Sequence, residues 1–207
     1  MTPLLALALA LATGHYPKPG LLVKPAERAN AEEAPVAKTP AAEPGSPEAL
    51  LGTRALAWDV TDWINSKPLA LKDLKGKVVL VRWWTGGGCP FCAATAPALN
   101  RFHANYADKG LVVIGFYHHK AQGPLDLASV KKATKSFGFQ FPVAVDPNWR
   151  TLKKWWLGGK RRQWTSVSFL IDRRGMIRHI HPGGQYAPGS KAYEDMKAKI
   201  EELVKEK

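Results

Sequence analysis

The sequence predicts an α/β fold in which helices flank both faces of a mixed central sheet. Two apolar, β-prone runs, residues 78–84 and 111–116, are too hydrophobic for edge strands and indicate central strands. A helical pattern at residues 90–108 separates them, so the three segments form a β-α-β unit. Further along, two short β-prone runs flank a turn at residues 172–175, which indicates an antiparallel hairpin and makes the sheet mixed.

The other predicted elements alternate between helix and strand until the hairpin, and a helix closes the chain. They are expected at residues 127–137 (helix), 141–145 (strand), 147–157 (helix), 167–171 with 176–180 (hairpin) and 191–207 (helix). Glycine is common just after helices, so Gly110 suits the end of the first helix and Gly158 the end of the third.

The N-terminal quarter of the chain differs in composition from the rest. Residues 1–54 contain a single aromatic side chain, Tyr16, and are rich in Pro, Ala and Glu. Residues 4–12 form a short apolar run that ends in an Ala-x-Ala pattern, although no Lys or Arg precedes it. We therefore expect a signal peptide or anchor at residues 1–12, a semi-extended linker at 13–54 and the folded domain at 55–207, with residues 1–54 dispensable for folding.

The net charge of +13 lies in the predicted domain, because basic and acidic residues balance within residues 1–54. A basic domain attracts acidic partners, an anionic lipid surface or nucleic acid. No nucleic-acid motif is present, so the Lys and Arg clusters are interpreted as solvated helix faces and loops. No nucleic-acid partner is expected.

The two cysteines, Cys89 and Cys92, lie three positions apart at a predicted strand-to-helix junction. A helix N-terminus stabilises a thiolate through its unpaired N–H groups and the positive end of its dipole. Cys89 lies where this field is strongest, and Cys92, one turn later, is placed to attack a mixed disulfide formed at Cys89. Pro90 suits the first turn of the helix. A purely structural disulfide is disfavoured, because so short a loop constrains little of the unfolded chain.

Strand, tight turn, Cys-x-x-Cys and helix, with Pro97 five residues after Cys92, resemble the thioredoxin superfamily. The sequences at residues 83–85 and 169–177 look most like the redoxin branch of bacterial thiol-disulfide oxidoreductases. This resemblance implies a thioredoxin-like fold over residues 55–205, with Cys89 as the attacking thiol and Cys92 as the resolving thiol. It also implies protein thiols or disulfides as substrates, a redox partner protein, and a periplasmic or cell-envelope location at or near a membrane.

The chain departs from this family just before the predicted hairpin. Members usually carry a cis-proline there that pairs with the substrate backbone, whereas this chain has Ser166 at that place and Thr165 before it. A cis peptide at a non-proline residue costs about 2.5 to 4 kcal/mol, so we expect a trans bond. Thr165 and Ser166, together with Pro90 and Phe91, are the candidate substrate-binding residues.

A second departure lies in the strand before the cysteines, where thioredoxins carry a buried carboxylate. The strand here offers Arg82 instead. We interpret Arg82 as a surface residue whose stem lies along the domain. The alternative, that Arg82 faces the site and stabilises a thiolate, stays open.

Two other functions compete with disulfide exchange. A peroxide-reducing, antioxidant redoxin would need Thr or Ser shortly before its cysteine, where this chain has glycines 86–88. A copper or zinc carrier could use both cysteines with His118 or His119, since thiolates favour soft metals. We interpret both histidines as solvated loop residues, and His179 and His181 as surface residues of the hairpin. No metal or cofactor is expected, and the direction of exchange does not follow from the sequence.

Overall fold

The computed structural model describes residues 42–86, 88–160 and 162–206. The chain divides into two compact units, Met1–Thr39 and Pro40–Lys207. The first unit lies outside the described residues, and so do the predicted signal peptide and most of the predicted linker. No helix among the described residues has the length and apolar character needed to cross a membrane.

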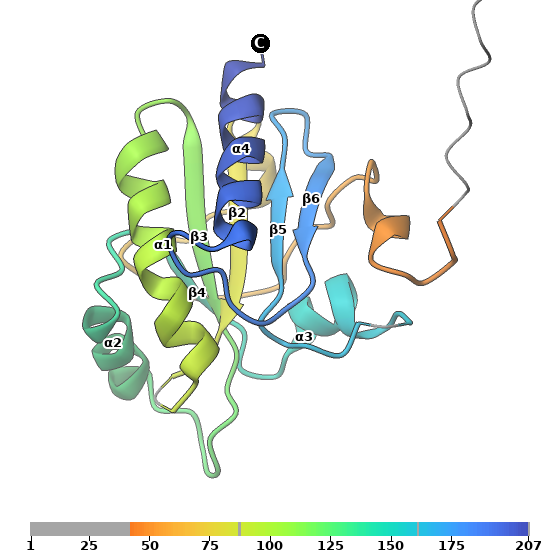
Figure 1. Ribbon diagram of the computed structural model, residues 1–207. Coiled ribbons are helices and arrows are strands. Elements are labelled where there is room, and N and C mark those ends of the chain that lie inside the picture. Colours follow the sequence, from red (N-terminus) through yellow and green to blue (C-terminus); the bar gives the residue numbers. More distant parts are fainter. Residues whose placement is uncertain (1–41, 87, 161, 207) are drawn as a thin grey trace, which may run out of the picture. The chain divides into compact units, whose positions relative to one another are not determined.

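A mixed, six-stranded sheet forms the centre of the domain (Figure 1), and the sequence predicts its mixed character and five of its strands. Its order is β1-β4-β3-β2-β5-β6. The strands are β1 (Asp62–Ile64), β2 (Val78–Trp84), β3 (Leu111–Tyr117), β4 (Val143–Val145), β5 (Ser168–Ile171) and β6 (Ile177–His181). Strands β2, β3 and β4 run parallel, whereas β1, β5 and β6 join by antiparallel pairing.

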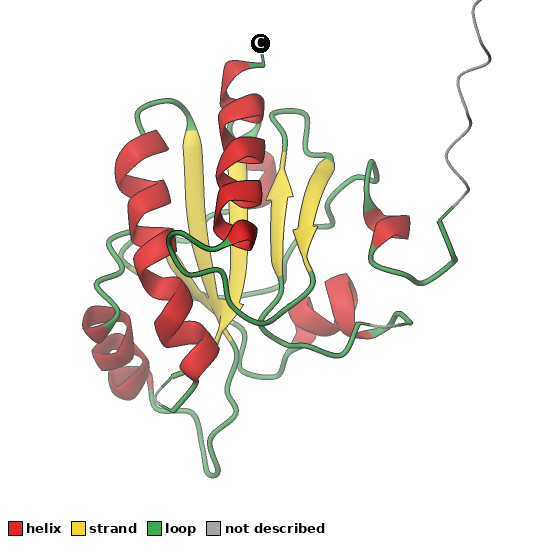
Figure 2. Ribbon diagram, viewed as in Figure 1, coloured by secondary structure: helices red, strands yellow, loops and turns green. Residues whose placement is uncertain are grey.

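Helices cover both faces of this sheet (Figure 2). The helices are α1 (Pro90–Tyr106), α2 (Leu127–Ser136), α3 (Arg150–Leu152) with its π-helical continuation η3 (Lys153–Leu157), and α4 (Lys191–Lys205). Two 3₁₀ turns, η1 (Glu48–Leu50) and η2 (Leu71–Leu74), precede β2. Figure 1 shows α1 and α4 next to each other over one face of the sheet.

Strand β2 is the centre of the core, and all seven of its residues are buried. Its side chains alternate: Leu80 and Trp84 belong to the core beneath α1 and α4, whereas Val81 and Trp83 belong to the core on the opposite face. Burying one large apolar side chain stabilises a fold by about 1.5 to 3 kcal/mol. The continuous apolar pattern of β2 is therefore explained by burial on both faces.

Three local differences from the predicted elements have clear causes. Strand β1 is not predicted, because three residues show no periodicity and the strand is defined by its pairing with β4. The helix predicted at residues 147–157 begins only at Arg150, because Trp149 at its N-cap has a left-handed backbone with φ of 59°. Strand β4 starts after Pro142, which has no N–H to donate to a neighbouring strand.

Residues at the end of the predicted linker contact the folded domain. Gly52 N–H donates to the Ile177 carbonyl at 2.8 Å, and Ile177 N–H donates to the Thr53 carbonyl at 2.9 Å. Ser46 is fully buried, and Leu50 packs against the core. A proline-rich composition did not reveal this strand-like pairing, because the partner strand lies more than a hundred residues later.

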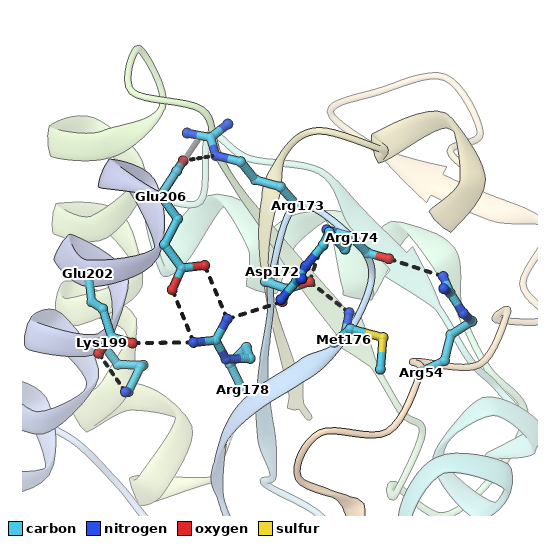
Figure 3. A network of polar contacts seen from close by, with 9 residues as sticks. All are labelled: Arg54, Asp172, Arg173, Arg174, Met176, Arg178, Lys199, Glu202 and Glu206. Carbon is cyan, nitrogen blue, oxygen red and sulfur yellow. Dashed lines mark hydrogen bonds and ion pairs between the residues drawn. The ribbon is translucent and has the colours of Figure 1, made fainter.

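An ion-pair network fixes the β5–β6 hairpin to α4 (Figure 3). Buried Asp172 accepts hydrogen bonds from the N–H groups of Arg174 and Met176, both at 2.9 Å, and pairs with Arg178 at 3.2 Å. Arg178 also pairs with Glu206 of the C-terminal segment at 3.0 Å. Burial alone would raise the pKa of Asp172, but these hydrogen bonds and the arginines outweigh it and lower that pKa.

Candidate active site around Cys89 and Cys92

The cysteine pair lies where β2 passes into α1. Cys89 is the N-cap of α1 and Pro90 occupies the first helical turn. Gly88, just before the pair, has φ of +87°, a conformation that side chains rarely adopt. Cys89 and Cys92 form a disulfide with a Cα–Cα distance of 5.3 Å, and Cys92 N–H donates to Cys89 Sγ at 3.2 Å. The first cysteine therefore lies at the positive end of the helix dipole.

The two sulfurs differ in accessibility. The Cys92 side chain is buried in the core with Trp84 and Leu99, and the residue is only 3% exposed. Cys89 is half-buried and only borders that core. A thiolate that approaches from solvent can therefore reach Cys89 but not Cys92.

Two clefts meet at Cys89. One, of about 630 Å³, is lined by Tyr117, His119 and Asp126 among others. The other, of about 650 Å³, extends along Pro90 and Ala93 towards α2. Both include Cys89 in their walls, so the sulfur is flanked by space that could take an extended peptide.

An exposed aromatic pair lies on another side of the disulfide. Phe91, between the two cysteines, is 37% exposed and packs edge to face against Trp164 at 5.8 Å between ring centroids. Trp164 is itself 56% exposed, and Thr165 beside it is half-buried. Sequence reasoning did not select Trp164 as a site residue, because its contact with Phe91 joins segments 73 positions apart. The available signal in the sequence was a tryptophan two residues before Ser166.

Ser166, at the place of the expected cis-proline, is buried and does not adopt a cis peptide; none occurs among the described residues. Its hydroxyl accepts a hydrogen bond from Gly184 N–H at 3.0 Å. Its carbonyl accepts one from the Arg82 guanidinium. Ser166 therefore holds the loop after β6 in place, and no hydrogen bond among the described residues joins its hydroxyl to either sulfur.

Arg82 is fully buried, and its interpretation as a surface residue is wrong. Its side chain points to the α1 face of the sheet, between Leu80 and Trp84 along β2. It contacts carbonyl groups and the Tyr186 ring rather than solvent. These partners come from loops that the strand pattern alone could not place beside it.

The two histidines after β3 have different environments. His118 is 1% exposed, against the Trp149 ring, so its interpretation as a solvated residue is wrong. Burial, assisted by Lys120, lowers the pKa of His118 to about 3. His119 lines the first cleft with Cys89 and contacts the Tyr117 hydroxyl at 3.2 Å. Of these two histidines, only His119 therefore lines the same cleft as Cys89.

His179 and His181 on β6 are half-buried rather than fully exposed. His181 packs against the Tyr186 ring at 5.0 Å. No three His, Cys, Asp or Glu side chains in the described part of the chain lie close enough together to hold a metal ion.

The sheet order, the flanking helices and a cysteine pair at the start of α1 define a protein of the thioredoxin-like fold. Residues 51–180 match the AhpC/TSA family. The chain belongs to that family.

Two curated proteins and one solved structure illustrate what the chain is similar to. The chain is 34% identical over 131 residues to Protein DipZ of Mycobacterium tuberculosis, covering 61% of this chain and 18% of that protein. It is 32% identical over 127 residues to the thiol-disulfide oxidoreductase ResA of Bacillus anthracis, covering 61% of this chain and 66% of ResA. Among solved structures, a thiol-disulfide isomerase from Corynebacterium glutamicum matches with a TM-score of 0.58 and 29% identity over 75% of this chain and 98% of that one. The chain thus spans less than two thirds of both curated relatives.

Proposed function

We propose that the protein is a thiol-disulfide oxidoreductase that exchanges disulfides with protein substrates through Cys89 and Cys92. The observation that carries this proposal is the difference between the two sulfurs. Cys89 is reachable at the N-terminus of α1, whereas Cys92 is buried one helical turn away. This arrangement supports attack at Cys89 and resolution by Cys92.

Disulfide exchange proceeds through two successive thiolate attacks. A substrate thiolate attacks Cys89 Sγ, the Cys89–Cys92 bond breaks, and its electron pair leaves on Cys92 as a thiolate. The second substrate thiolate then attacks the substrate sulfur of the mixed disulfide and releases Cys89 as a thiolate. The substrate becomes a disulfide and the protein a dithiol. Substrate reduction is the same sequence in reverse, with Cys92 resolving the mixed disulfide.

The surroundings of Cys89 favour its thiolate as leaving group and as nucleophile. Cys92 N–H lies 3.2 Å from Cys89 Sγ and can donate to a negative sulfur. The free N–H groups and the dipole of α1 act in the same direction. The clefts beside Cys89 and the exposed pair Phe91 and Trp164 offer polar and apolar surface for a peptide on either side of the sulfur.

A location outside the cytoplasm is part of this proposal. The apolar run at residues 4–12 supports export, and the proline-rich segment after it supports a spacer between an anchor and the domain. Oxidising compartments are where dithiol exchange with folding proteins is needed. A separate redox protein would regenerate the dithiol or the disulfide, and the basic domain is suited to lie near an anionic membrane surface.

Turnover of a protein disulfide tests the proposal. With dithiothreitol as reductant, the wild-type protein is expected to accelerate the reduction of insulin, and Cys89→Ser is expected to lower this rate at least roughly 100-fold, because the nucleophile is removed. Hydrogen peroxide serves as the control substrate, and little acceleration is expected with it. Acceleration with peroxide but not with insulin would show that the protein is a peroxide-reducing redoxin instead.

A further inference from the structure

Arg82 carries a buried charge that has no buried counter-charge. Its guanidinium donates to the carbonyls of Ser166 and Gly184, the latter at 2.7 Å, and lies over the Tyr186 ring at 5.2 Å. Longer contacts of 3.4 Å reach the hydroxyls of Thr95 and Ser168. Within the described residues, no carboxylate pairs with it.

The other titratable groups nearest to Arg82 are neutral at pH 7. Burial raises the pKa of Tyr186 above its usual value of about 10, so its hydroxyl stays protonated. Burial, assisted by Arg82 itself, lowers the pKa of His181 to about 4. An arginine, in contrast, stays protonated inside proteins. The guanidinium is therefore the dominant charge in this part of the core.

Thr95 connects this charge to the cysteine pair. Its hydroxyl donates to the carbonyl of Phe91, which lies between the cysteines, at 2.7 Å, and it faces Arg82 at 3.4 Å. Thr95 and Cys92 are both buried, one turn apart on α1. Residues three apart on a helix have Cβ atoms about 5 to 6 Å apart. Together with the 3.4 Å contact between Arg82 and the Thr95 hydroxyl, this places the guanidinium within roughly 13 Å of the Cys92 sulfur.

We infer that Arg82 is a positioning residue whose buried charge stabilises the Cys92 thiolate and thereby makes the Cys89–Cys92 disulfide a stronger oxidant. This inference rests on the proposed exchange and gives it a preferred direction. When a substrate thiolate attacks Cys89, the bonding electron pair leaves on Cys92, where burial alone would disfavour a negative charge. A unit charge about 13 Å away, at an effective dielectric constant of about 20, favours that thiolate roughly tenfold. Whatever stabilises the reduced form raises the reduction potential.

A comparison of the wild type with Arg82→Gln and Arg82→Lys distinguishes the effect of the Arg82 charge from that of its hydrogen bonds. Gln keeps a donor for the same carbonyls without the charge, whereas Lys keeps the charge. Equilibration with glutathione buffers at about pH 9.5, where the Cys92 thiol is ionised, followed by thiol counting, gives the ratio of reduced to oxidised protein. We expect Gln to lower this ratio about tenfold, or about 30 mV towards a more reducing protein. Lys is expected to stay within about threefold of the wild type. A purely structural role would leave the ratio for Gln unchanged.

A second measurement does not require Arg82 to be replaced. In the Cys89→Ser variant, the thiolate absorbance of Cys92 near 240 nm is expected to titrate below the usual thiol pKa of about 8.5, although a buried thiol would titrate above it. A titration above this value, or an unchanged glutathione ratio in a folded Arg82→Gln protein, would overturn the inference. Neither result depends on protein substrates, so the proposed exchange would stand or fall separately in the insulin assay.

Discussion

Replacing Cys92 by Ser is expected to convert the protein into a trap for its substrates. The Cys89 thiolate attacks a substrate disulfide and forms a mixed disulfide with it. Resolution of that bond by the protein requires the Cys92 thiolate. In Cys92→Ser, covalent complexes with disulfide-containing proteins should therefore accumulate until most of the variant is bound. Non-reducing gel electrophoresis of the variant incubated with a purified disulfide protein measures the complex, and dithiothreitol should dissolve it.

Cys89→Ser is the matched control for this experiment, because it differs only in which sulfur remains. The remaining Cys92 is 3% exposed and should form no complex. Trapping by Cys89→Ser instead of Cys92→Ser would reverse the two roles. Trapping by neither variant would remove exchange with proteins as the function.

A protein that starts at residue 55 is expected to fold cooperatively but with lower stability. It lacks the backbone hydrogen bonds of Gly52 and Thr53 with Ile177, the buried Ser46 and the packing of Leu50. A hydrogen bond contributes about 0.5 to 1.5 kcal/mol, so a loss of about 1 to 3 kcal/mol is expected. For a domain of this size, the melting temperature should fall by about 3 to 10 °C.

A protein that starts at residue 42 keeps all these contacts and is the control for the truncation. Its melting temperature, followed by circular dichroism, should equal that of the full chain. Equal melting temperatures for the proteins starting at residues 42 and 55 would show that the segment before Ala55 does not stabilise the domain.

The sequence was sufficient where a local pattern determines the structure. The continuous apolar runs of β2 and β3 require burial on both faces, and this places them at the centre of the sheet. Two cysteines three apart, after a strand and before a helical pattern, lead directly to a dithiol at a helix N-terminus. The order of elements and the mixed sheet follow from the same local patterns.

Features that depend on contacts between distant segments could not be predicted. Arg82 is buried because carbonyls of residues 166 and 184, far away in the chain, accept hydrogen bonds from its two terminal nitrogens. His118 is buried because Trp149 covers it. Burying a polar group without a hydrogen bond is costly, so a polar residue looks exposed in a sequence until its distant contacts are known. Both ring nitrogens of His118 are buried without a hydrogen-bond partner among the described residues, so no polar partner could have signalled its burial.

The reactivity of the two thiols tests the proposed division of roles between Cys89 and Cys92. The reduced protein is treated with short pulses of iodoacetamide from pH 4 to pH 10, and mass spectrometry of its peptides measures the labelling of each cysteine. We expect rapid labelling of Cys89 with a midpoint below the free-cysteine value of about 8.5, because only the thiolate reacts and α1 stabilises it. Cys92 is expected to stay unlabelled in the folded protein. Equal labelling of both cysteines, or a Cys89 midpoint at or above the free-cysteine value, would show that Cys89 is not the selectively activated thiol.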